Sequence, residues 1–188
     1  MKSLSILIPI YNEEESLQAL FEELKSSFEN NQSIEIIFIN DGSSDMSQKV
    51  IENEIANHST WKLINLYRNY GKSVALQSGI DIASNELIAT LDGDLQDDPK
   101  ELINLVRELN EDDVIVGWKK DRLDPLEKKI ASKIFNFFIK LFSGLKIKDS
   151  NSGIKVLKKE VAKSLNLYGG RHRYIPLLAH QKGFNVKE

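Results

Sequence analysis

The sequence contains no cysteine among its 188 residues, which excludes several classes of protein. A chain without cysteine has no disulfide framework, thiolate metal site or cysteine nucleophile, and it fits a reducing compartment. No apolar run approaches the roughly 18 residues that span a bilayer. The first apolar stretch, residues 4–10, is short, is broken by Pro9 and does not resemble a secretory signal. We therefore expect a soluble, cytosolic chain, and its 41% hydrophobic residues suffice for one domain.

The small net charge of −3 conceals a strong asymmetry. Residues 1–117 carry 22 acidic and 8 basic side chains, a net charge of −14. Residues 118–188 carry 6 acidic and 17 basic side chains, a net charge of +11. Such a division suggests that the second part meets an anionic partner such as phosphate, nucleic acid or a membrane surface. Solvated lysine-rich helix faces are the simpler alternative.

Short runs rich in Ile, Leu and Val alternate with helical patterns in the first part of the chain. The runs are residues 4–10, 34–39, 61–66, 86–91 and 113–116. They are typical of strands buried on both faces of a parallel sheet, so the order predicts an α/β fold with a mostly parallel, doubly wound sheet flanked by helices.

Three helices are expected. One follows the first strand, with Asn12 as N-cap and Glu15 completing a capping box. A second begins with Asp98 as N-cap and Pro99 as its first residue. The third covers the strongly apolar residues 130–145 and is interpreted as a core helix, with contact to a membrane or lipid tail as the alternative.

Polar clusters follow the predicted strands, and ligands of doubly wound sheets bind beyond the carboxyl ends of strands. The most informative is D-G-D-L-Q-D-D-P, residues 92–99. A strand period of two would place Asp92, Asp94 and Gln96 on one side, and three such oxygen-bearing groups suit Mg²⁺ or Mn²⁺. Gly93 would let a ligand approach the backbone. An acidic loop favoured by the dipole of the following helix is the structural alternative.

Other nucleotide and hydrolase motifs are missing. There is no G-x-G-x-x-G after the first strand, no G-x-x-x-x-G-K-[S/T] and no G-x-S-x-G. A dehydrogenase, a P-loop NTPase and a serine hydrolase are therefore not expected.

Four ordered motifs carry a resemblance to a known family: I-P-I-Y-N-E-E-E-S-L (8–17), N-D-G-S-S-D (40–45), R-N-Y-G-K (68–72) and D-G-D-L-Q-D (92–97). The chain resembles the family-2 glycosyltransferases of the Rossmann-like GT-A fold. It is most similar to the branch of dolichol-phosphate mannose synthase and bacterial polyprenyl-phosphate glycosyltransferases. S-K-I-F-N (132–136), S-G-I-K (152–155) and H-R-Y-I-P (172–176) also resemble that branch, so the similarity covers nearly the whole chain.

The resemblance implies a single catalytic domain, with residues 1–117 binding nucleotide and metal and residues 118–188 forming the acceptor side. It implies a nucleotide-lining set of Pro9, Tyr11, Glu13, Ile39, Asp41, Asp92, Gly93 and Lys119. It implies phosphate or acceptor contacts from Lys128, Ser132 and Lys155. The metal, Mg²⁺ or Mn²⁺, would be held by Asp92, Asp94 and Gln96. Neither Arg68 nor Lys72 is expected to be catalytic, and a structural role is the alternative for both.

The implied reaction is an inverting transfer of a sugar from a UDP- or GDP-sugar to a polyprenyl phosphate at the cytoplasmic membrane face. A lipid phosphate is already anionic, so cations matter more than a general base. A sugar-hydroxyl acceptor, the alternative, would need a base such as Asp94. A non-catalytic nucleotide-sugar-binding module is a second alternative. Nucleic acid is not expected as a partner, because no recognition motif supports it.

One departure from the branch concerns the C-terminal side. Members commonly continue into a basic loop resembling R-x-x-G-x-S-K-Y and often into membrane helices. We therefore expect the 188 residues to be a C-terminally truncated catalytic domain that binds nucleotide with metal but transfers sugar poorly.

Overall fold

The computed structural model describes residues 2–28, 31–118, 145, 147 and 152–188. The expected helix at residues 130–145 therefore lies outside the described residues, apart from Leu145. Within these ranges, no helix has both the length and the apolar composition that a bilayer span requires. The described elements are β1 (Leu4–Ile10), α1 (Leu17–Phe28), β2 (Ile34–Asn40), α2 (Ser47–Ile55), β3 (Trp61–Asn65), α3 (Lys72–Ile82), β4 (Leu87–Thr90), α4 (Glu101–Glu108), β5 (Val114–Val116), β6 (Lys155–Lys158), α6 (Lys159–Ser164), the 3₁₀ turn η1 (Arg171–Tyr174), α7 (Ile175–Gln181) and β7 (Val186–Lys187).

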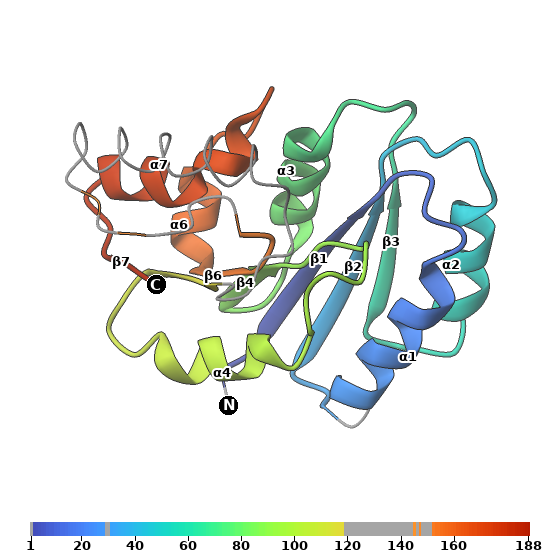
Figure 1. Ribbon diagram of the computed structural model, residues 1–188, viewed down its shortest axis with the longest axis horizontal. Coiled ribbons are helices and arrows are strands. Elements are labelled where there is room, and N and C mark those ends of the chain that lie inside the picture. Colours follow the sequence, from blue (N-terminus) through green and yellow to red (C-terminus); the bar gives the residue numbers. More distant parts are fainter. Residues whose placement is uncertain (1, 29–30, 119–144, 146, 148–151) are drawn as a thin grey trace, which may run out of the picture.

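A seven-stranded mixed sheet in the order β3-β2-β1-β4-β6-β5-β7 forms the centre of the molecule (Figure 1). Strands β3, β2, β1 and β4 are mutually parallel, and β6 runs antiparallel to both β4 and β5. The five strands expected from the sequence are confirmed, each within one residue at either end. Strands β6 and β7 were not expected. The prediction of a mostly parallel sheet flanked by helices is confirmed.

Helices cover both faces of this sheet (Figure 1). On one face, apolar side chains of α1, α2 and α4 pack against alternate strand residues such as Ile6, Ile8 and Phe38. On the other face, α3, α6 and α7 pack against the intervening residues, such as Leu7 and Ile37. The central strands are buried on both sides, which explains why they read as continuous apolar runs.

The two expected helix starts are both displaced. The first helix begins at Leu17, so Asn12 is not its N-cap and the capping box with Glu15 is wrong. Asn12 instead has a positive φ of 54°, and its Oδ1 accepts a hydrogen bond from Ser44 N at 2.8 Å. The regular part of α4 begins at Glu101, although Asp98 Oδ1 still accepts a hydrogen bond from Lys100 N at 2.9 Å.

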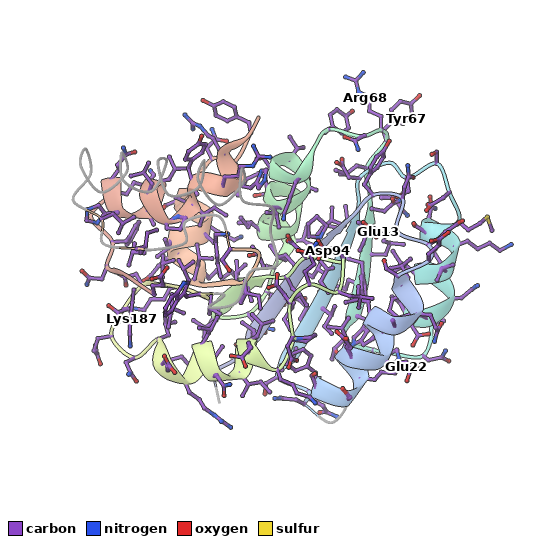
Figure 2. All side chains as sticks on the ribbon, viewed as in Figure 1. Glu13, Glu22, Tyr67, Arg68, Asp94 and Lys187 are labelled. Carbon is purple, nitrogen blue, oxygen red and sulfur yellow. The ribbon has the colours of Figure 1, made fainter. Side chains whose placement is uncertain are left out.

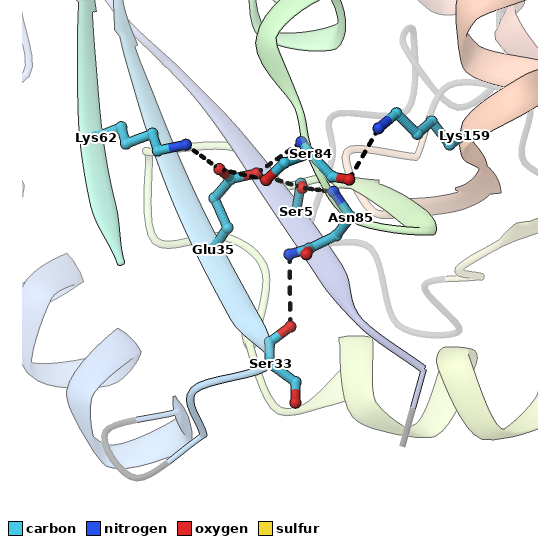
Figure 3. Close-up of polar contacts among 7 residues, drawn as sticks. All are labelled: Ser5, Ser33, Glu35, Lys62, Ser84, Asn85 and Lys159. Carbon is cyan, nitrogen blue, oxygen red and sulfur yellow. Dashed lines mark hydrogen bonds and ion pairs between the residues drawn. The ribbon is translucent and has the colours of Figure 1, made fainter. Parts of the chain in front are cut away.

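A buried polar network joins the strands at the end of the sheet where β1 and β2 begin (Figure 3). Glu35 in β2 is 6% exposed and accepts hydrogen bonds from Ser5 Oγ at 2.5 Å and from Ser84 N at 3.1 Å. It also forms an ion pair with Lys62 of β3. Burial opposes ionisation of Glu35, but these bonds outweigh it and lower the pKa of the carboxyl below its ordinary value. The network therefore ties β1, β2, β3 and the residues before β4 together.

We expect Glu35→Ala to lower the free energy of unfolding by about 2–4 kcal/mol, because Lys62, Ser5 and the Ser84 N–H lose a shared buried partner. Urea denaturation at neutral pH measures the change. The control is Glu108→Ala at an exposed position of α4, for which a change within about 0.5 kcal/mol is expected. Equal effects of the two substitutions would contradict a stabilising role for the network.

Candidate functional site

The carboxyl ends of β1, β2 and β4 lie side by side, and the loops that follow them form the site. Asp41, directly after β2, is 3% exposed. Its two carboxylate oxygens accept hydrogen bonds from Tyr70 N and Gly71 N, each at 2.8 Å. A side chain at Gly42 would clash with the backbone of Arg68, and its φ of 68° also favours glycine. Residues 41–42 therefore fix the loop that leads into α3.

The loop after β1 is bound to the loop after β2 by hydrogen bonds between backbone and side chains. Asn12 N donates to Ser43 Oγ at 3.0 Å, and Glu13 N donates to Ser47 Oγ at 2.9 Å. Glu14 Oε2 accepts from Met46 N at 2.7 Å. Asn12, which has a positive φ, also accepts a hydrogen bond at its Oδ1 from Ser44 N of the second loop. The motifs 8–17 and 40–45 thus form one unit.

Ser16 connects this unit to the acidic loop that follows β4. Its Oγ lies 2.9 Å from Glu13 Oε2 and 3.4 Å from Gly93 O. Figure 2 shows Glu13 and Asp94 in the central part of the molecule, whereas Tyr67 and Arg68 project from the loop before α3. The Glu13 turn and the D-G-D segment are therefore held next to each other.

The acidic loop itself differs from the sequence expectation in its backbone. Strand β4 ends at Thr90, and Leu95 has a positive φ of 60°, so the period-two alternation assumed for residues 92–96 is wrong. Asp94 and Gln96 are exposed, and Gln96 N donates to Asp94 Oδ1 at 3.2 Å. Asp92 is partly buried and forms an ion pair with Lys72, its Oδ1 lying 2.5 Å from Lys72 Nζ. The loop presents Asp92 and Asp94 by a turn and not by a strand face.

Gly153 brings the segment before β6 against this acidic loop. Thr90 Oγ1 donates a hydrogen bond to Gly153 O at 2.7 Å. A Cβ at Gly153 would lie 3.0 Å from Asp92 Oδ2 and would clash with Asp97, which is 6% exposed. Only glycine therefore lets the chain pass so close to these two carboxylates.

We expect Gly153→Ala to destabilise the protein by about 1–3 kcal/mol, because the added methyl group overlaps Asp97 and displaces Asp92. Thermal unfolding measures the loss. Gly170→Ala is the matched control, since a Cβ there meets nothing within 4 Å and the residue has a negative φ of −93°. A loss no larger than that of the control would show that the contact is not tight.

Basic residues from β6 and η1 gather beside the acidic loop. Lys155 is 5% exposed, donates a hydrogen bond to Ser152 O, and lies opposite Thr90 in the β4–β6 pairing. His172 is held against α3, where Ser73 Oγ lies 2.9 Å from His172 Nδ1 and accepts the His172 backbone N–H at 3.0 Å. Burial is the largest cause that lowers the pKa of His172 to about 4. Charges acting in the same direction come from Lys72, Arg173 and Lys155, whereas Asp92 opposes them.

We expect the His172 ring to titrate with a midpoint of about 4 in the folded protein, against 6.5 for an ordinary histidine. Between these pH values the unfolded chain binds more protons at this position, so this residue makes the fold less stable as pH falls through that window. NMR of the histidine ring protons measures the midpoint. His172→Gln identifies the signal and should flatten the dependence of stability on pH; a midpoint near 6.5 would contradict the assignment.

The donor set of the acidic loop suits a hard divalent cation, because it offers carboxylate and amide oxygens and no sulfur. Asp94 and Gln96 are on the surface, and Asp92 Oδ1 already contacts the ammonium group of Lys72. Among the described residues, no three His, Asp or Glu side chains are grouped as a ready metal site. The residues expected to hold Mg²⁺ or Mn²⁺ thus have suitable chemistry, and their assignment as ligands stays a prediction.

The described residues of the expected nucleotide set lie mostly at this edge. Pro9 is at the end of β1, Tyr11 follows it and is 47% exposed, and Glu13, Asp41, Asp92 and Gly93 lie in the loops described above. Ile39 differs, because its side chain is fully buried against α3. Lys119, Lys128 and Ser132 lie outside the described residues.

Sequence reasoning missed Lys72, Thr90, Gly153 and His172 as parts of this region. Lys72 was not expected to be catalytic, and His172 was not assigned a role. Lys72, Gly153 and His172 lie in segments that resemble the family branch, whereas Thr90 lies in a predicted strand. The contact between Thr90 and Gly153 depends on the unexpected antiparallel strand β6. Ser152 Oγ is also buried there and has no hydrogen-bond partner among the described residues.

Two curated relatives are similar over most of this chain. A dodecaprenyl-phosphate galacturonate synthase of Rhizobium johnstonii is 37% identical over 178 residues, which cover 92% of this chain and 53% of the relative. An undecaprenyl-phosphate 4-deoxy-4-formamido-L-arabinose transferase of Photorhabdus laumondii is 35% identical over 185 residues, covering 96% of this chain and 56% of the relative. The chain thus spans about half the length of these relatives.

Solved structures share the fold at low sequence identity. A mannosyltransferase from Pyrobaculum calidifontis, in complex with GDP-Man and Mn²⁺, matches with a TM-score of 0.76 and 14% identity, over 99% of this chain and 54% of that one. TarS of S. aureus in complex with UDP-GlcNAc matches with a TM-score of 0.67 and 17% identity, over 99% and 55%. The GT-A-like architecture expected from the sequence is confirmed. Because the model of glycosyl transferase family 2 also matches residues 5–165, nearly the whole described sheet and its loops, the chain belongs to that family.

Proposed function

We propose that this chain is the catalytic domain of an inverting, metal-dependent glycosyltransferase that moves a sugar from a nucleotide-sugar donor to a polyprenyl phosphate. The similar proteins of Rhizobium and Photorhabdus are named for dodecaprenyl- and undecaprenyl-phosphate substrates. The Pyrobaculum neighbour was crystallised with GDP-Man and Mn²⁺. These names support both the donor class and the acceptor class of the proposal.

The donor side of the proposal rests on the loops after β1, β2 and β4. Asp41 and Glu13 would contact the nucleoside, and Pro9, Tyr11, Ile39 and Gly93 would line its pocket. The buried Ile39 would contribute through its backbone. Asp92, Asp94 and Gln96 would hold Mg²⁺ or Mn²⁺. A bound divalent cation stabilises the negative charge that develops on a departing nucleoside diphosphate.

The observation that carries the acceptor side is the gathering of positive charge beside Asp92. Lys72, Lys155 and Arg173 all lower the pKa of His172, and the charge of Asp92 raises it. An anionic acceptor next to a diphosphate must be brought in against charge repulsion, and fixed cations reduce that repulsion. A phosphate acceptor therefore fits this arrangement better than a neutral sugar hydroxyl. Lys119, Lys128 and Ser132 would add contacts to donor or acceptor phosphates.

The acceptor also implies where the reaction takes place. A polyprenyl phosphate is anchored in a bilayer, so the domain would act at the cytoplasmic face of the membrane, in the synthesis of cell-envelope glycans. The excess of basic residues after position 117 would favour an anionic membrane surface as well as phosphate.

The proposal is tested by incubating the protein with Mn²⁺ and UDP- or GDP-sugars in the presence of undecaprenyl phosphate or oligosaccharide acceptors. Sugar is expected on the lipid phosphate, at the low rate expected of these 188 residues, with Asp94→Asn reducing transfer and Mn²⁺-dependent nucleotide binding at least tenfold. Asp98→Asn, at an exposed position of the same loop, is the control and should retain both.

The outcomes separate the alternatives. Transfer to the oligosaccharide alone would assign a hydroxyl acceptor, with Asp94 as its candidate base. Nucleotide binding without transfer to either acceptor, also by a chain as long as the relatives, would favour a non-catalytic binding module. Binding that is equal in Asp94→Asn and in the unsubstituted protein would remove Asp94 from the metal site.

A further inference from the structure

Lys72 neutralises the acidic loop from a fixed position. It is the first residue of α3, and the preceding Gly71 is bound through its N–H to Asp41 at 2.8 Å. The next residue, Ser73, is buried and linked to His172 at 2.9 Å. The backbone of Lys72 is therefore held on both sides, while its four-carbon side chain reaches Asp92.

Asp92 has two oxygens with different surroundings. Oδ2 faces Gly153, and a Cβ added to Gly153 would lie 3.0 Å from this oxygen. Oδ1 faces Lys72 Nζ at 2.5 Å. The side chains of Lys72 and Asp92 are 33% and 27% exposed, so solvent and small ions reach this pair. Because Gly153 lies against Oδ2, an incoming cation would approach Asp92 at Oδ1, the oxygen that Lys72 contacts.

A divalent cation and an ammonium group do not share such a position easily. Mg²⁺ lies about 2.0–2.1 Å from its oxygen ligands. Because Lys72 Nζ lies 2.5 Å from Asp92 Oδ1, a cation bound to that oxygen would lie less than about 5 Å from Lys72 Nζ. Two cations at that distance repel each other strongly, even at a protein surface. The backbone of Lys72 is fixed, but its side chain has four rotatable bonds. The side chain can therefore rotate away from the metal and relieve the repulsion.

We propose that Lys72 and the divalent cation compete for Asp92, and that Lys72 turns to the phosphates of the nucleotide when the metal is bound. The proposal rests on the proposed function, since it concerns the same metal and donor. It assigns Lys72 a positioning role: the lysine keeps the acidic loop neutralised before the donor arrives and then neutralises the donor's own charge.

The proposal predicts effects of opposite sign for one substitution. Lys72→Met removes the competing charge and keeps an unbranched side chain of similar length. Affinity for Mn²⁺ alone should rise about three- to tenfold. Affinity for a nucleoside diphosphate in the presence of saturating Mn²⁺ should fall by a similar factor, because a phosphate contact is lost. A residue with a merely structural role would weaken both.

Calorimetry and the electron paramagnetic resonance of free Mn²⁺ measure the metal step, first with Mn²⁺ alone and then with UDP or GDP added. Lys49→Met on α2 is the control for the loss of one positive charge, and its Mn²⁺ affinity should be unchanged. In an Asp92→Asn background, Lys72→Met should no longer raise the affinity for Mn²⁺, because the shared carboxylate is gone.

Unchanged or weaker Mn²⁺ binding in Lys72→Met, or no detectable binding in either protein, would overturn the proposal. A rise in Mn²⁺ affinity that persists in the Asp92→Asn background would overturn it too. These results are independent of sugar transfer: competition at Asp92 together with no transfer to a lipid phosphate would leave the inference standing while the proposed function failed.

Discussion

The pairing of β6 with β4 is the interaction on which the arrangement of the site depends. Because β6 runs antiparallel to β4, its first residue, Lys155, lies opposite Thr90 at the carboxyl end of β4. The bond from Thr90 Oγ1 to Gly153 O extends this ladder by one more contact. A parallel strand in the same place would bring its last residues to this edge. The direction of β6 thus brings the basic part of the chain to the acidic loop.

The two oppositely charged parts of the sequence therefore come close together in the fold. The first part carries −14 and the second +11, and strands from both parts are neighbours at one end of the sheet, in the order β4-β6-β5-β7. Asp92 and Lys72, both in the first part, lie 2.5 Å apart. Lys155 and Arg173 of the second part act together with them on the pKa of His172. Opposite charges near one another limit the self-repulsion that each part of the chain would have alone. Burial keeps His172 uncharged at neutral pH, so it adds no further positive charge.

Much of the fold could be predicted from the sequence, for a physical reason. Strands such as β1 and β2 are buried on both faces, and that burial requires the continuous apolar runs from which they were predicted. Strand β6 was missed because Lys155 and Lys158 begin and end it, and its pairing partners are distant in sequence. Helix α1 was begun too early because Asn12, a residue suited to capping, serves the neighbouring loop instead.

The site was only partly predictable. Single segments pointed to Asp41, Asp92 and Asp94, because each lies directly after a recognisable strand. Contacts such as Lys72 with Asp92, or Gly153 with the acidic loop, need two segments to be placed in space, and periodicity within one segment carries no information about that. The turn at Leu95 has the same limitation, since its positive φ follows no simple pattern of residue types.

The two hydrogen bonds that Asp41 accepts fix the backbone of the loop before α3 independently of its tyrosine side chains. Asp41 holds the loop through two backbone N–H groups, which every residue except proline possesses. The side chains of Tyr67 and Tyr70 take no part in these two bonds and are exposed, whereas Gly71, with a φ of 89°, is in a conformation that favours glycine. Substitutions at Tyr67 and Tyr70 would therefore change the surface of this loop, while the path of the chain into α3 stays fixed by the bonds to Asp41.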